Sequence, residues 1–439
     1  MAAPVAPRRA PSVLSLAVPA LVVLAAEPLY LLVDTAVVGN LGTVALGGLA
    51  VGGGLLAWAA ALLNFLAYGT TARAARRAGG GDRAGAVEEG VQATWLALAL
   101  GLLVVVLFQL LAGPLTRLLA GGAGPIADAG EDWLRIAVLG APLLLVSLAG
   151  NGWLRGVQEL RRPVRFVLAG SLLSLVLCPV LVHPAGLGLV GSAVANVTGQ
   201  ALTAALFLQA LRHEGATWRV RPGALVRQLV IGRDLLLRAA VLQLSFLVAA
   251  GVAARAGAAA LGAHQIALQL FFFLALVLDA YAIAAQTLVG QALGGGRPRD
   301  ARATARRVTA WGLGTGCFVA ALLLALRDVV PPLFTDDPEV LAQAAVVWWF
   351  LAGFQPLAGV VFALDGVLMG AGDVGYLRTV TVAAALAGFL PLSLLAGPLD
   401  LGLAGVWTGL TLFIALRLVA VLARVAGNRW LGAPETVGR

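Results

Sequence analysis

The chain has 439 residues, of which 60% are hydrophobic and only 12% are charged, and its formal net charge is +9. This small number of charged residues cannot cover the surface of a soluble globule, and the composition therefore excludes a soluble fold. Apolar runs of about 18 or more residues recur along the chain, and each can cross a hydrocarbon core of about 30 Å. We therefore expect a polytopic membrane protein.

Twelve apolar runs are expected to span the membrane. Lipid offers no hydrogen-bond partners to the backbone, and the runs are too long and too uniformly apolar for barrel strands. We therefore expect helices throughout and an all-α fold. The expected spans are residues 12–39, 45–72, 91–120, 133–154, 163–183, 187–211, 227–254, 262–291, 304–330, 340–370, 376–397 and 401–425.

The first span contains a carboxylate, Asp34, and a proline six residues before it, Pro28. A carboxylate in the bilayer costs roughly 2.5 to 3.5 kcal/mol to insert, so its default interpretation is a function with protons, ions or cationic substrates. Burial disfavours the charged form of an acid, so Asp34 can load and release a proton. Pro28 removes a backbone hydrogen bond and predicts a bend in the helix. The alternatives are a paired structural acid and a static kink.

The arginines indicate the orientation of the chain. All 30 basic residues are arginine, and 26 of them fall on one side if both termini lie there, including Arg155, Arg238 and Arg417. The exceptions are Arg117, Arg135, Arg255 and Arg327. The positive-inside rule then predicts cytoplasmic termini. Because the arginines are scattered over short loops without an aromatic-rich soluble domain, they do not indicate nucleic-acid binding.

Two further interpretations of short segments are less favoured. Arg8 and Arg9 before the first span also fit a cleaved signal, but cleavage near Ala25 would remove half of that span. Cys178 and Cys317 lie inside apolar runs and indicate neither a disulfide nor a metal site. No metalloprotease helix, nucleophile elbow or Walker sequence is present, so we expect no enzyme activity and no cofactor.

The chain contains an internal duplication at an offset of 214 or 215 residues. Gly42, Leu46 and Gly47 recur as Gly257, Leu261 and Gly262; the glycines 79–81 recur at 294–296, Pro142 recurs as Pro356, and 187–191 recurs as 401–405. Six spans per repeat predict two lobes, 1–215 and 216–439, related by a pseudo-two-fold axis along the membrane normal. A central cavity between the lobes is expected, and residues 212–226 form the connection.

Several segments resemble the multidrug and toxic compound extrusion (MATE) transporters, particularly their DinF-like branch. They are PLYLLVDTAVVG at 28–39, LRGVQ at 154–158, AHQI at 263–266, AAQTLVGQ at 284–291 and DGVLMGAGD at 365–373. The resemblance covers essentially the whole chain. It implies a V-shaped cavity between two six-helix lobes and export of cationic or amphipathic compounds in exchange for inward protons or sodium. Members of the family work by alternating access in the membrane.

The resemblance also implies roles for individual residues. Asp34 matches the first-helix aspartate that is linked to proton or sodium coupling. In sodium-binding relatives an asparagine and an aspartate of the fifth helix and a threonine of the sixth join this residue, whereas this chain has Ser174, Cys178 and Asn196. A neutral thiol is a poor sodium ligand, so proton coupling is favoured over the sodium alternative.

The second half of the chain lacks the seventh-helix glutamate of NorM-type relatives, where Gln243 or a neighbour stands. Asp365 falls near an aspartate that those relatives use for cation coupling, and Asp279 resembles an acid of the DinF-like branch. Each is either a second proton or substrate site or a paired structural acid. Asn151 and Gln265, like Asn64 and Gln286, are uncharged groups that can line the cavity or bond helices together.

Three expectations concern partners and location. The aromatic run Phe271, Phe272 and Phe273 is interpreted as facing lipid or the membrane interface. A flippase of the wider superfamily remains an alternative, but it would need arginine in the cavity, whereas the buried charges placed from the sequence are mostly acids, which favours cationic substrates. We expect a monomer, surrounded by lipid, in a bacterial cytoplasmic membrane.

Overall fold

The computed structural model describes residues 13–396, 399 and 401–432. Three arginines of the cytoplasmic set, Arg8, Arg9 and Arg439, lie outside the described residues, as do the first residue of the expected span 12–39 and the last residue of the expected span 376–397. The described residues form helices joined by short loops, with no strand among them. Twelve of the helical stretches are long and apolar enough to cross a membrane. The expected all-α membrane fold is confirmed.

Three of the spans consist of more than one element: α2 and α3, then α5 to α6, and last α13 to α14. The elements are α1 (Val13–Gly39), α2 (Thr43–Leu63), α3 (Phe65–Gly79), α4 (Arg83–Leu119), α5 (Pro125–Ala137), η1 (Val138–Gly140), α6 (Ala141–Gly156), α7 (Arg161–Val182), α8 (Gly188–His213), α9 (Pro222–Arg255), α10 (Ala258–Gly294), α11 (Pro298–Ala325), η2 (Pro331–Leu333), α12 (Pro338–Gly370), α13 (Val374–Ala384), the π-helical η3 (Ala385–Phe389), α14 (Leu390–Leu395), α15 (Gly402–Ala426) and η4 (Arg429–Gly432).

Most helices are longer than the apolar runs that predict them. The third span begins at Arg83, eight residues before the expected start, because Asp82 caps the helix by accepting a hydrogen bond from the amide of Gly85. The ninth ends at Ala325, before the expected end at residue 330, ahead of the proline pair that opens η2. Capped polar turns thus extend helices such as α4 beyond their apolar runs, and hydropathy alone does not predict these extensions.

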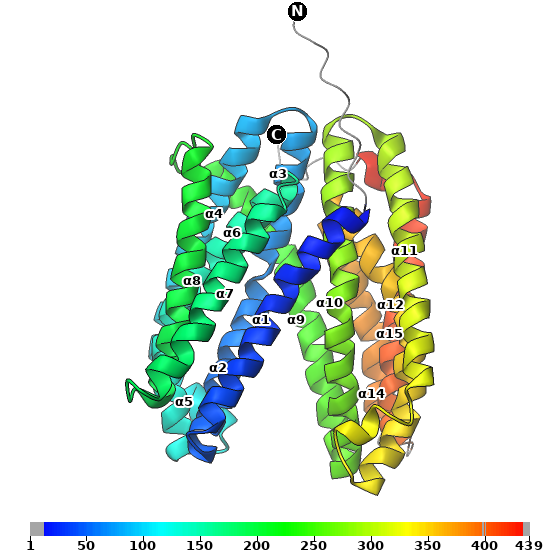
Figure 1. Cartoon of the computed structure of the whole chain (residues 1–439). Coiled ribbons are helices and arrows are strands. Elements are labelled where there is room, and N and C mark those ends of the chain that lie inside the picture. Colours follow the sequence, from blue (N-terminus) through cyan, green and yellow to red (C-terminus); the bar gives the residue numbers. More distant parts are fainter. Residues whose placement is uncertain (1–12, 397–398, 400, 433–439) are drawn as a thin grey trace, which may run out of the picture.

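Figure 1 shows two helical bundles side by side. The amino-terminal bundle contains α1 to α8, coloured blue to green, and the carboxy-terminal bundle contains α9 to α15, coloured green to red. Helix α1 crosses between them: its first half packs on α10 and its second half on α7. Helix α9 makes the reciprocal crossing and contacts α3 of the amino-terminal bundle. The first helix of each bundle thus packs against the other bundle at the interface.

The two bundles meet at the end of the molecule that carries the loops 79–83, 157–160, 294–298 and 370–374, here called the arginine-rich end. The Gln291 amide donates to the carbonyl of Gly156 over 2.9 Å, and the Gln286 amide donates to that of Tyr68 over 2.7 Å. The Arg76 guanidinium donates to the carbonyl of Ala371. Toward the opposite end the bundles diverge (Figure 1).

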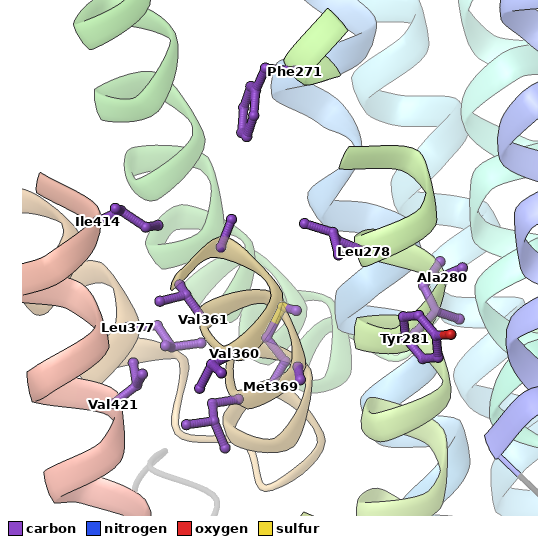
Figure 2. Close-up of a cluster of buried hydrophobic side chains, with 14 of the residues drawn as sticks. Phe271, Leu278, Ala280, Tyr281, Val360, Val361, Met369, Leu377, Ile414 and Val421 are labelled. Atoms are coloured by element: carbon purple, nitrogen blue, oxygen red, sulfur yellow. The ribbon is translucent and has the colours of Figure 1, made fainter. Parts of the chain in front are cut away.

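The largest apolar core lies in the carboxy-terminal bundle and continues into the interface. Figure 2 shows part of it, with Leu278 of α10, Val361 of α12 and Ile414 of α15 directed into the bundle. The first turns of α1 join this core through Leu16 and Ala20, which are buried. Burial of these side chains therefore attaches one end of α1 to the carboxy-terminal bundle.

Matched glycines of the two halves have matched geometry. Gly42 and Gly257, which precede α2 and α10, have φ angles of 106° and 122°, a region open to glycine but strained for other residues. A Cβ atom on Gly152 would lie 2.4 Å from the carbonyl oxygen of Ala67, and one on Gly366 would lie 2.2 Å from that of Ala282. These pairs show that equivalent helices approach closely in both halves.

Candidate functional site: two cavities and their charged residues

A cavity of about 340 Å³ lies in the amino-terminal bundle. Four of its lining residues, Leu24, Ala61, Asn64 and Tyr68, also line a cavity of about 520 Å³ in the carboxy-terminal bundle. Asn64 stands at the break between α2 and α3, a position that hydropathy does not distinguish. The two cavities therefore share a wall at the interface between the bundles.

Asp34 lies on α1 and is 1% exposed. The Cys178 thiol of α7 donates to its Oδ1 atom over 3.1 Å. The hydroxyl of Ser192 on α8 faces the same carboxyl group, although Oδ2 has no hydrogen bond of good geometry among the described residues. The Trp133 indole donates to the Ser192 oxygen over 3.3 Å, which leaves the serine proton available for Asp34. Ser192 and Trp133 carry no signal in the sequence that would have identified them.

Ser174 and Asn196 lie near Asp34 but make no hydrogen bond with it among the described residues. Both line the amino-terminal cavity, whereas Asp34 does not. The Ser174 hydroxyl donates to the carbonyl of Ala195 over 3.1 Å, and the Asn196 oxygen accepts from the Gln200 amide over 2.6 Å. Tyr30, one turn before Asp34, contacts Asn196 and also lines the cavity. Asp34 thus lies outside the cavity lining, next to Tyr30, which lines the cavity and interacts electrostatically with Asp34.

Pro28 lies within α1, which is helical on both sides of it. Proline has no amide hydrogen, so the carbonyl of Leu24 lacks its usual helical partner. Glu27, beside Pro28, lines the amino-terminal cavity. The bend that Pro28 predicts would therefore fall between the half of α1 packed on α10 and the half that holds Asp34.

The carboxy-terminal cavity has aromatic walls. Phe246, Phe271, Phe272 and Phe354 line it, and their rings contact one another at centroid distances of 5.1 to 6.2 Å. The expectation that the run 271–273 faces lipid is wrong for Phe271, which is buried, whereas Phe272 lines the cavity and is also 40% exposed. Phe273 is 69% exposed, as expected for a lipid-facing side chain.

Asp279 and Asp365 both line the carboxy-terminal cavity, in different surroundings. Asp279 accepts a hydrogen bond over 2.8 Å from the Tyr68 hydroxyl, which belongs to the other bundle. Asp365 is 3% exposed, and its Oδ2 atom accepts from Arg417 over 2.5 Å and also from Arg238. Asp365 is therefore a paired acid, and Asp279 joins the bundles.

The predicted uncharged residues have different outcomes. Asn151 lines the amino-terminal cavity, and Gln243 lines the carboxy-terminal one. Gln265 is exposed and lines neither of these cavities. It shares a helical face with Phe272 but lies about two turns beyond the lining residues. Gln286 lines a smaller cavity near the arginine-rich end and bonds to the other bundle.

The placement of three arginines differs from the sequence prediction. Arg155 lines the amino-terminal cavity, and Arg238 and Arg417 line the carboxy-terminal one, instead of lying in cytoplasmic loops. Helices α6, α9 and α15 place these side chains within the bundles. Arg155 directly follows the expected span 133–154, whereas Arg238 and Arg417 lie inside the expected spans 227–254 and 401–425, so assigning them to cytoplasmic segments was wrong. The two cavities therefore hold these three arginines beside three acids, Glu27, Asp279 and Asp365, so their charges no longer favour cationic substrates over anionic ones.

The sequence is similar to one family model and to several curated proteins. The family model MatE matches residues 19–180 and 235–394. The chain is 33% identical to the protein DETOXIFICATION 44, chloroplastic, of Arabidopsis thaliana, over 93% of this chain and 80% of that protein. It is also 33% identical to the DNA damage-inducible protein F of Escherichia coli (strain K12), over 92% and 89%.

Solved structures have the same fold. A crystal structure of a MATE protein in the bent conformation is 22% identical, with a TM-score of 0.86 over 94% of this chain and 95% of that one. An outward-facing multidrug resistance MATE family transporter is 20% identical, with a TM-score of 0.84 over the same shares.

Proposed function

The chain belongs to the MATE family of membrane transporters, which are not enzymes, and on that premise we propose that it exports amphipathic small molecules in exchange for protons bound at Asp34. The observation that carries the proposal is a buried acid beside the lining of a cavity. An acid is costly to place inside a membrane, so its presence there indicates a function. Its surroundings offer donors to a carboxylate without a compensating arginine.

The contacts of Asp34 support a proton over sodium as the coupling ion. Sodium requires several hard oxygen ligands, whereas Cys178 presents a thiol that acts as a donor to Asp34. A proton needs only the carboxyl group, and Oδ2 has no well-formed hydrogen bond among the described residues. Sodium coupling through Asp34, Tyr30 and Asn196 is the alternative that an ion-replacement experiment must exclude.

The arrangement of the bundles supports alternating access. We assign the arginine-rich end to the cytoplasm by the positive-inside rule, with both termini on that side. The bundles meet there and diverge at the other end, as in an outward-facing transporter. We propose that the lobes 1–215 and 216–439 rock against each other, and that protonation of Asp34 shifts α1 and weakens substrate binding.

Efflux from everted membrane vesicles tests this function. Asp34→Asn is expected to abolish dye or drug movement driven by a pH gradient while expression stays normal, and Asp300→Asn, an exposed acid of α11, is the matched control. Each ion gradient is imposed separately. Undiminished pH-driven efflux by the Asp34 variant would refute the role of Asp34, and strict dependence on sodium would overturn proton coupling.

A flippase for lipids with anionic headgroups is the second candidate. It is favoured by one observation, the presence of Arg155, Arg238 and Arg417 in the cavities. We propose that the chain acts as a monomer in a bacterial cytoplasmic membrane in either case. A vesicle assay that compares anionic and cationic substrates separates the two functions.

A further inference from the structure

Five charged side chains gather where the two cavities meet. They are Arg155 of α6, Arg238 of α9, Asp279 of α10, Asp365 of α12 and Arg417 of α15. Asp279 interacts electrostatically with Arg155, Arg238 and Asp365, and Arg417 interacts with Asp365 and Arg238. Three guanidinium groups thus face two carboxyl groups, and the cluster carries an excess of positive charge even when both acids are ionised.

The internal pairing leaves this excess on the cavity side. Arg238 and Arg417 share one oxygen of Asp365, so one carboxylate serves two cations. Asp279 accepts its hydrogen bond from Tyr68 and not from an arginine. Arg155 is 5% exposed and lines the cavity, and among the described residues its guanidinium group makes no hydrogen bond or close ion pair, Asp279 being the acid that interacts with it electrostatically. A buried guanidinium is stable in such a place only when an anion compensates it.

The surroundings of the cluster define the rest of a ligand. Phe246, Phe271, Phe272 and Phe354 form a continuous aromatic wall in the same cavity. The Arg417 guanidinium lies 5.5 Å from the Phe413 ring, so apolar and cationic surfaces adjoin. A molecule that fits has an anionic head and an aromatic or aliphatic body.

We propose that Arg155 and Arg238, one from each bundle, hold the carboxylate, sulfonate or phosphate of an amphipathic anion whose body packs on this phenylalanine wall. The arginine fork matches such groups through two parallel hydrogen bonds. Because the two arginines belong to different bundles, the ligand bridges the surfaces that alternating access separates. The transport of this ligand rests on the proposed function, whereas its binding does not.

Equilibrium binding with two matched probes tests the site. Pyrenebutanesulfonate and pyrenebutyl-trimethylammonium have the same aromatic body and opposite permanent charges. The full chain is placed in nanodiscs, and protein-free nanodiscs correct for partition into lipid. The sulfonate is expected to bind about tenfold or more tightly than the ammonium. Equal or stronger binding of the ammonium probe would overturn the proposal.

Variants locate the binding. Arg155→Gln is expected to weaken sulfonate binding about tenfold or more, and Arg155→Lys should restore part of it. Asp279→Asn should tighten sulfonate binding, because it removes a negative charge while the amide oxygen still accepts from Tyr68. Arg424→Gln, an ion-paired arginine on α15 outside the cavities, should leave binding unchanged. Sulfonate binding that is insensitive to both Arg155→Gln and Asp279→Asn would refute the site.

Two further measurements separate the outcomes. Sulfonate binding is measured again in Asp34→Asn, which should keep the anion site although proton-coupled efflux is lost. Proton-driven export that shows no preference for anions would refute the anion site and leave the proposed function standing. Flipping of a fluorescent phosphatidylglycerol in proteoliposomes identifies the source of the anionic group. Flipping that requires Arg155 indicates a lipid headgroup, and sulfonate binding without flipping indicates a soluble amphipathic anion.

Discussion

The thiol of Cys178 decides the surroundings of Asp34. A thiol is a weak donor and a soft ligand, so it accommodates a carboxyl group without supplying the oxygen that sodium prefers. We therefore propose that the residue at this position influences which ion couples transport. Among the described residues, Cys178 is the donor whose hydrogen bond to Asp34 has good geometry.

Replacement Cys178→Asp is expected to make efflux depend on sodium. The Cys178 Sγ atom lies 3.1 Å from Oδ1 of Asp34, so an aspartate at residue 178 would place two buried carboxyl groups side by side. Both cannot ionise unless a cation lies between them. Efflux is measured at fixed pH with and without a sodium gradient, with Cys178→Ser as the control that keeps a neutral donor. A Cys178→Asp protein that remains active and indifferent to sodium would contradict this account of selectivity.

Close helix contact in the second half depends on single glycines. Gly366→Ala would place a Cβ atom 2.2 Å from the carbonyl oxygen of Ala282, and that backbone cannot move aside easily. We expect a loss of about 1 to 3 kcal/mol in the free energy of unfolding. Gly353→Ala on the same helix meets no atom within 4 Å and should stabilise by about 0.5 to 1 kcal/mol. Thermal unfolding in detergent measures both; equal shifts would contradict the packing argument.

At the scale of elements, α1 carries Asp34, the proposed coupling residue, and contacts both bundles. Its first half packs on α10, and its second half packs on α7 next to Cys178. Pro28 lies between these halves. If the bundles rock as proposed, a helix attached to both must bend or slide, and the missing hydrogen bond at Pro28 makes bending the less costly choice.

Replacement Pro28→Ala is expected to slow efflux while equilibrium binding of substrate stays nearly constant. Alanine restores the amide that the carbonyl of Leu24 lacks, so the helix resists bending. Pro19→Ala in the same helix is the matched control, because residue 19 lies within the half packed on α10. Initial rates in vesicles and binding in nanodiscs are compared. Unaltered rates in Pro28→Ala would show that α1 moves as a rigid rod.

At the scale of the whole molecule, the sequence predicted the twelve spans because lipid makes length and hydropathy nearly sufficient for a helix. It also indicated that Asp34 lies buried in the first helix, whereas the role of Asp34 in coupling stays a prediction. It did not predict the three arginines of the cavities, since the positive-inside rule counts arginines by side of the membrane and does not say whether a side chain faces water or a cavity. The pairing across bundles, such as Tyr68 with Asp279, depends on contacts that no local pattern records.

The closed arginine-rich end offers a test of the rocking motion itself. The ideal Cβ position of Gly290 in α10 lies 2.9 Å from the Cβ atom of Ala75 in α3, so cysteines at these two positions can form a disulfide after a small adjustment. The background is Cys178→Ser with Cys317→Ser. Gly48→Cys with Ala129→Cys, a pair at 2.8 Å inside the amino-terminal bundle, is the matched control.

Oxidation of the pair across the bundles is expected to abolish efflux, and reduction is expected to restore it, because export requires this end to open. The control pair should tolerate oxidation, since its two helices, α2 and α5, belong to one bundle and move together. Sulfonate binding should survive in the locked protein, because the cavities remain open toward the opposite end. Efflux that continues while the disulfide across the bundles is intact would mean that substrate passes without separation of the bundles, and the two-lobed mechanism would have to be abandoned.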